Sequence, residues 1–276
     1  MLLSRRYDAL MLGPRNGPFS LRGTPHADSV PSPNSSCNTG MSVVLLDATG
    51  YFRRVPLRLC AFCGLLSPLA FVIGWAAGGL AQPDAYSLVD DSVSDLGALT
   101  ADQAWIYNQV GANFTGLLVA ALAYGLWKVG LPGLSGRIGV IALAVMGIGQ
   151  FFDGWFRLDC RAIDAGCSNG GTGWQVVAHE IESLFTVLGL LVSVFALARA
   201  FKKAERWRDL RTPSLIAGCA TIAVFIGLLF VGGGLAVRLG LAVWFAWVAL
   251  VSYRLLRIAE EQDQIGKAAR PAASPA

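Results

Sequence analysis

Six long apolar runs follow one another along the chain from residue 60 onward. Each is close to the ~20 residues that an α-helix needs to cross about 30 Å of hydrocarbon at a rise of 1.5 Å per residue. The pattern therefore predicts an all-α fold, a polytopic membrane protein in which six transmembrane helices form a bundle. The predicted spans are residues 60–81, 105–127, 137–156, 176–199, 214–232 and 235–256.

The apolar runs occupy residues 60–258, and the segments on either side have a different character. Residues 1–50 are rich in Pro, Gly, Ser and Asn and show no periodicity that could bury a face, so this tail is expected to be disordered. An alternative is that Met41 is the initiator and the preceding residues extend the gene model. Residues 259–276 are expected to form a disordered cytoplasmic tail.

Composition supports the membrane assignment. Hydrophobic residues make up 54% of the chain and charged residues 14%, whereas roughly 25% of the residues in a soluble domain are charged. The net charge of +4 does not indicate nucleic-acid binding, because the basic residues stand in short groups between the apolar runs. We therefore expect the lipid bilayer as a partner and no nucleic acid.

Lysine and arginine predict the orientation of the spans. They gather in alternate connections, which the positive-inside rule places in the cytoplasm together with both termini. The first connection contains Asp84, Asp90, Asp91, Asp95 and Asp102 but no Lys or Arg, so this connection and the third are expected outside the cell membrane. The basic groups are Arg53, Arg54 and Arg58; Lys128 and Arg137; Arg199, Lys202, Lys203, Arg206, Arg208 and Arg211; and Arg254 and Arg257.

The cysteines predict one disulfide and no metal site. Cys160 and Cys167 share the third connection, which faces an oxidising environment if it is outside, and a bridge there would contribute roughly 2.5 kcal/mol. The alternative is two free thiols in a reducing setting. Cys60 and Cys63 have the spacing of half a zinc site, but no second pair follows. Only two histidines exist, one of them in the tail, so neither a metal nor another cofactor is expected.

Polar residues inside or beside the spans are the candidates for chemistry, because burying them is costly. On a helix, His179 shares a face with Glu182 and Ser183. Asp153 ends the third span and Asp159 follows it, so either can approach His179. Ser94 and Asp95 of the first connection add a hydroxyl and another acid. These residues could form a functional site of acids, a base and hydroxyls at the predicted outer face. Alternatively, they hydrogen-bond to one another and only hold the helix ends together.

Two stretches of the chain resemble a known family. They are SVSDLGALTADQAWIYNQVGANFTGLL, which includes Ser94, Leu96, Gly97 and Asn108, and GQFFDGWFRLDC, which includes Asp159. Both are similar to bacterial and archaeal membrane proteins described as domain of unknown function 998. The resemblance covers about residues 60–258 and includes His179. It implies six helices and no established reaction.

Three functions remain open for a multi-pass membrane protein of this kind. The first is a membrane-embedded hydrolase or receptor-like pocket for a lipid or small amphiphile. The second is a small carrier or channel lined by Asp153, His179 and Glu182, although the inner halves of the spans carry few polar residues and no inverted repeat is evident. The third is a structural or accessory protein without a site. A pocket closed at its floor favours the first function, and a polar path across the bilayer favours the second.

Overall fold

The computed structural model describes residues 56–83, 85–168, 170–228 and 231–268. The tail at residues 1–50, with the alternative start at Met41, lies outside the described residues, as do residues 269–276. Within the described part every regular element is a helix, and no strand is present. Six of its helices are long and apolar enough to cross a membrane, which confirms the predicted fold class.

The six spans lie close to their predicted positions. The second span consists of two segments, the π-helix η2 followed by α3, and a short 3₁₀ helix, η3 (Glu205–Leu210), leads into the fifth. The spans are α2 (Leu57–Leu80), η2 (Ile106–Phe114) with α3 (Thr115–Val129), α4 (Gly133–Asp153), α5 (Trp174–Phe201), α6 (Arg211–Leu228) and α7 (Gly233–Ala268).

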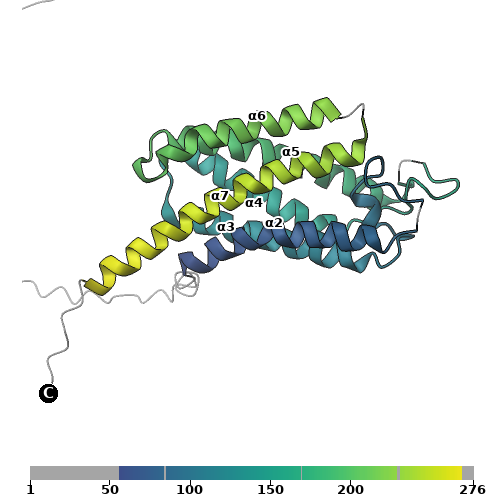
Figure 1. Ribbon diagram of the computed structural model, residues 1–276, viewed down its shortest axis with the longest axis horizontal. Helices are drawn as coiled ribbons and strands as arrows, with labels where there is room; N and C mark the ends of the chain where they lie inside the picture. Colours follow the sequence, from purple (N-terminus) through teal and green to yellow (C-terminus); the bar gives the residue numbers. More distant parts are fainter. Residues whose placement is uncertain (1–55, 84, 169, 229–230, 269–276) are drawn as a thin grey trace, which may run out of the picture. The chain divides into compact units, whose positions relative to one another are not determined.

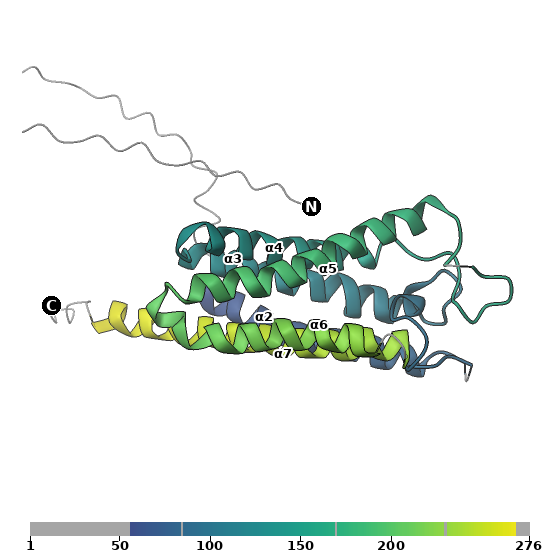
Figure 2. The same ribbon diagram turned by 90° about the horizontal axis from the view of Figure 1, so that it is seen from above.

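Neighbouring helices pack side by side in a bundle (Figures 1 and 2). α4 packs between α3 and α5, and α2 packs between α3 and α7. α6 packs against α5 and α7, so the last two spans form a helical hairpin. We call the end with connections 81–105 and 154–173 the disulfide end, and the end with connections 130–132 and 202–210 the basic end.

Glycines allow α4 to approach its two neighbours closely. A Cβ added to Gly147 would lie 2.7 Å from the backbone nitrogen of Ala120 in α3, and one added to Gly189 of α5 would lie 2.7 Å from the carbonyl oxygen of Ala142. Lipid tails give helices little hydrophobic reason to associate, so close backbone packing at small residues is a main source of attraction in a membrane. α4 is thereby held firmly at the centre of the site described below.

The π-helix η2 was not foreseen from the sequence. Its wider turn is rare and frequently occurs at functional sites. Here it presents the buried residues Tyr107 and Asn108 at the disulfide end. The side-chain amide of Asn108 donates a hydrogen bond of 3.1 Å to the carbonyl of Gly97 and so holds the 3₁₀ helix η1 (Ser94–Gly97) against the second span.

The end of α7 corrects one prediction. Residues 259–268, expected to begin a disordered tail, continue the helix to Ala268. Two ion pairs join this extension to other helices: Arg58 with Asp263, and Arg206 with Glu261, each at 3.1 Å. The hydropathy pattern predicted only where α7 leaves the membrane, and a charged segment can remain helical in water when it has such partners.

Candidate functional site

Three ionisable side chains meet near the disulfide end. Asp153 ends α4, while His179 and Glu182 lie one turn apart near the start of α5, and each residue is less than a tenth exposed. Nδ1 of His179 lies 3.3 Å from Oδ1 of Asp153 and 3.8 Å from Oε2 of Glu182. The structure thus brings together three of the residues that the sequence singled out, and we call them the acid–histidine cluster.

Neighbouring side chains orient both carboxylates of the cluster. The Tyr107 hydroxyl donates a 2.7 Å hydrogen bond to Oδ2 of Asp153, and the Gln150 amide approaches the same oxygen at 3.5 Å. The Thr186 hydroxyl donates a 2.8 Å bond to Oε1 of Glu182. These contacts leave the second oxygen of each carboxylate directed toward His179.

The cluster lines a cavity of about 430 Å³ between the spans. Every one of the six spans contributes to its wall, as does the first connection. The described lining includes no Lys or Arg, so the carboxylates of Asp153, Glu180 and Glu182 face only one basic side chain, His179. The polar lining residues are Ser92, Ser94, Tyr107, Gln150, Asp153, His179, Glu180, Glu182, Ser183 and Thr186.

The remaining wall of the cavity is apolar. It consists of Phe71, Val93, Val187, Leu190, Phe225, Val237 and Leu241. Beneath Leu190, the buried cluster of large apolar side chains continues toward the basic end, for example through Met146, Val194 and Trp244. A molecule with a polar head and an apolar tail would match this division of the lining.

The buried serines below the cavity do not form a polar path. Ser67, Ser193, Ser214 and Ser252 each donate to a backbone carbonyl within one turn of the chain. Their hydroxyls are therefore used locally, as is usual for Ser in an apolar helix. Among the described residues, the polar lining on α5 extends one turn beyond the cluster to Thr186, and Leu190 follows it at the apolar floor of the cavity.

The other predicted site residues are divided between the cavity and the loops. Ser94 and Ser183 both line the cavity. Asp159 does not: its Oδ2 accepts hydrogen bonds from the backbone N–H groups of Thr172 (3.2 Å) and Gly173 (2.9 Å). These N–H groups precede α5, so Asp159 stabilises the start of that helix, where a negative charge is favourable.

Asp95 also lies outside the cavity lining. It is 3% exposed, and burial raises the pKa of its carboxyl above the ordinary value, although backbone N–H groups of Ala162 and Ser92 oppose that rise. One of its oxygens, Oδ2, is buried without a hydrogen-bond partner among the described residues. Asp95 therefore belongs to the packing of the two connections at the disulfide end.

Sequence reasoning did not select Tyr107 or Thr186 for the site. Both are common residues in apolar segments, and neither is ionised near neutral pH. Thr186 lies four residues after Glu182, and this spacing could have placed it beside the carboxylate. No comparable signal links Tyr107 to Asp153, because 46 positions separate them and the contact depends on how the π-helix meets α4.

The predicted disulfide between Cys160 and Cys167 is present, with the two Cα atoms 5.9 Å apart. Within the closed loop, the Arg161 guanidinium pairs with Asp164 at 2.8 Å. Arg161 and the Thr100 hydroxyl lower the pKa of Asp164 to about 2. The contacts of Asp164 with Thr100 and of Arg161 with Gln82 join the loop to the first connection.

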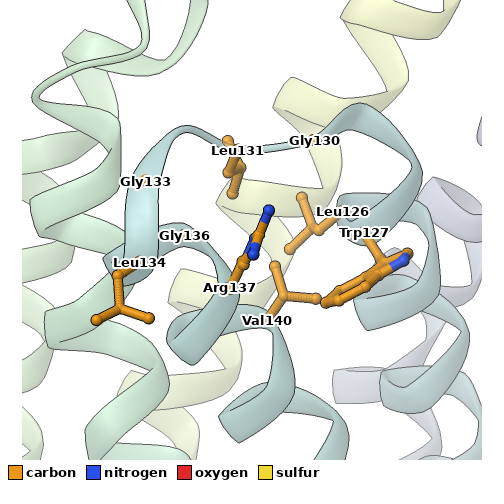
Figure 3. A pocket seen from close by; sticks show the side chains of 9 residues that line it. All are labelled: Leu126, Trp127, Gly130, Leu131, Gly133, Leu134, Gly136, Arg137 and Val140. Carbon is orange, nitrogen blue, oxygen red and sulfur yellow. The ribbon is translucent and has the colours of Figure 1, made fainter.

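A second cavity, of about 460 Å³, lies at the basic end between α3 and α4. Figure 3 shows the Arg137 side chain rising from α4 toward the turn at Gly130 and Leu131, with Trp127 beside it. Arg137 is the one charged residue in its described lining, and none of the predicted site residues is there. This cavity therefore lacks the acid and base that the first one contains.

Comparison with known proteins gives a family and no individual relative. The family model described as Protein of unknown function (DUF998) matches residues 65–254. No curated protein and no solved structure matches the chain. The matched residues cover well over half of the chain and include the acid–histidine cluster and parts of all six spans. The chain therefore belongs to the DUF998 family, a family of unknown function, as the sequence resemblance predicted.

Proposed function

We propose that this protein is a membrane-embedded hydrolase that takes a lipid or other small amphiphile into the cavity of the acid–histidine cluster. One observation carries the proposal: buried Asp153, His179 and Glu182 meet in a cavity that is also lined by apolar side chains of α2, α5, α6 and α7. The polar head of an amphiphile would lie at the cluster, and its chain would lie against residues such as Phe71 and Phe225.

His179 is the general base in this proposal. It would accept a proton from a water molecule, the hydroxide so formed would attack the carbonyl carbon or phosphorus of the substrate, and His179 would return the proton to the leaving group. Asp153, 3.3 Å from Nδ1, would orient the imidazole and stabilise its charged form. Ser94 and Ser183 supply hydroxyls on the same cavity wall that can bind the head group.

The position of the cavity supports entry from the membrane. The lining joins α5 to α6 and α7 through Val187, Phe225 and Val237, and α5 diverges from α6 toward the disulfide end (Figure 2). The apolar floor and the locally bonded serines argue against a carrier or channel, which needs polar groups along its whole path.

The test is turnover of amphiphiles by the purified protein. We expect detergent-solubilised protein to hydrolyse at least one member of a panel of long-chain esters, amides and phosphodiesters, with product detected by mass spectrometry. Short water-soluble analogues should react more slowly, since they leave the apolar wall empty. His179→Ala should reduce turnover about 10²–10⁴-fold, the range for loss of a general base.

Glu205→Gln is the matched control for Glu182→Gln. Glu205 is exposed at the basic end, far along the chain from the cavity lining. The Glu205→Gln variant should keep full turnover, whereas Glu182→Gln should lose much of it. Absence of turnover by the parent protein across the panel, or equal turnover by His179→Ala, would refute the hydrolase; ion or solute flux through reconstituted vesicles would favour a carrier instead.

A further inference from the structure

The donor atoms of the acid–histidine cluster have the spacing of ligands around one metal ion. Asp153, His179 and Glu182 can each offer an atom within 4.8 Å of the other two. Zinc bonds of about 2.0–2.2 Å in a tetrahedral site place neighbouring ligand atoms roughly 3.3–3.6 Å apart. The observed separations, 3.3 Å from Nδ1 of His179 to Asp153 and 3.8 Å to Glu182, are close to that value.

Two of these atoms are buried and unsatisfied. Among the described residues, Nδ1 of His179 and Oε2 of Glu182 have no hydrogen-bond partner, and both residues are 8% exposed. A buried polar atom without a partner costs about 1–3 kcal/mol. Here the two atoms lie 3.8 Å apart on neighbouring turns of α5, so a single cation between them and Asp153 would satisfy both.

The outer contacts of the cluster are those that support metal ligands. Tyr107 holds Oδ2 of Asp153 and Thr186 holds Oε1 of Glu182, which leaves the opposite oxygens for the ion. Ligating carboxylates are generally fixed by such second contacts, and losing one typically weakens metal binding 10–100-fold. The ligands also stand on two rigid helices rather than on loops.

The charge around the cavity also favours a cation. The two carboxylates of the cluster are buried, the exposed Glu180 adds a third carboxylate to the lining, and the described lining contains no Lys or Arg. Two arginines close in sequence to lining residues have their guanidinium groups bound to backbone carbonyls instead. Arg157 donates to the carbonyls of Gly97 and Ala98 (2.7 Å each), and Arg238 donates to those of Leu88 and Asp91 (2.7 and 3.0 Å).

We propose that Asp153, His179 and Glu182 bind one Zn²⁺ ion in this cavity. An imidazole with two carboxylates suits zinc, whereas Mg²⁺ and Ca²⁺ prefer oxygen ligands alone. The sequence argued against zinc because it was short of histidines, but carboxylates can replace the missing imidazoles. Three protein ligands leave a fourth position open to the cavity, as in catalytic zinc sites, where the ion activates water. Zn²⁺ bound at Nδ1 would replace the contact between His179 and Asp153 used in the proposed hydrolase, and the ion rather than His179 would then activate water. Metal binding requires no turnover, so it is tested separately from the proposed function.

The test is metal binding by the full chain, purified in detergent with a tag that lacks histidine. After treatment with a chelator and titration with Zn²⁺, elemental analysis should find one ion per chain. His179→Ala should bind at least 100-fold more weakly, and Glu182→Gln should also be impaired, whereas Glu205→Gln and His26→Ala should bind as the parent does. Zn²⁺ should raise the melting temperature of the parent but not that of His179→Ala.

Tyr107→Phe keeps all three ligands and serves as the second variant should His179→Ala fail to fold. It should bind Zn²⁺ about 10–100-fold more weakly than the parent. Less than one ion per chain in the parent would overturn the proposal. Unchanged affinity in Tyr107→Phe, together with loss of the ion in Cys63→Ser, would overturn it as well, by placing the metal at the thiols of Cys60 and Cys63.

Discussion

At the scale of single residues, the disulfide end places two carboxylates in opposite environments. Asp164 is paired with Arg161 and Thr100, which lower its pKa to about 2. Asp95 is buried, and desolvation raises its pKa. Both were acidic residues of an outer connection in the sequence, and only the first had a basic partner three positions away that could indicate its state.

Asp95→Asn is expected to raise the melting temperature of the protein near pH 7 relative to the parent. Because the folded pKa of Asp95 lies above its unfolded value, the folded state binds more protons in that window, and the parent loses stability as pH rises from about 4. The Asn variant lacks this loss. Thermal unfolding in detergent between pH 4 and 8 measures the difference.

Asp90→Asn is the control for this measurement, since Asp90 is exposed in the same connection. It should keep the pH dependence of the parent. An Asp95→Asn variant that is less stable than the parent at pH 7 would instead show that the ionised carboxylate is held by the N–H groups of Ala162 and Ser92.

At the scale of elements, the position of α4 decides the site, because this helix carries Asp153 and Gln150 and packs against both α3 and α5. Glycines on α4 and α5 set the distances between these helices. The added-Cβ positions at Gly147 and Gly189 lie within 3 Å of backbone atoms on the facing helix, which cannot move aside as a flexible side chain can. Side chains there would push the helices apart.

Gly147→Leu is therefore expected to destabilise the protein by about 1–3 kcal/mol, the usual cost of overpacking. Gly227→Leu is the matched control, because Gly227 lies within α6 and has nothing within 4 Å of an added Cβ. Melting temperatures of both variants in detergent provide the comparison. Similar losses in the two would mean that the α3–α4 contact is not limited by Gly147.

At the scale of the whole molecule, charge is segregated between the two ends of the bundle. The connection at 202–210 and the helix ends beside it are basic, whereas the connection at 81–105 is acidic. Because Lys and Arg are retained in the cytoplasm, the acid–histidine cluster and its cavity should lie toward the outer leaflet.

A reporter fused after Ala276, or inserted near Lys203, should behave as cytoplasmic, and one inserted at Ala165 in the disulfide loop should behave as external. Six spans return the chain to the side from which it started, and the basic residues should keep that side inside. Activity of enzymatic reporters specific to each compartment measures this. An external signal at Lys203 would reverse the orientation of the whole bundle.

Prediction from sequence succeeded where the signal was local. Hydropathy over about 20 residues located the spans, and the spacing of His179, Glu182 and Ser183 placed them together on α5. It failed where the cause lay elsewhere in the chain. The continuation of α7 to Ala268 involves ion pairs with Arg58 and Arg206, and Asp159 is drawn away from the cavity by N–H groups at 172–173.

The sequence by itself determined the class of protein, the number of spans, the cysteine pair that forms the disulfide and the family, because each depends on composition or spacing along the chain. Only the tertiary structure decided which polar residues share a cavity. Tyr107, Asp153 and His179 belong to three different spans, and their meeting depends on the π-helix and on how closely the glycines let α4 approach its neighbours. Packing between helices sets those distances, and residue spacing along one helix does not.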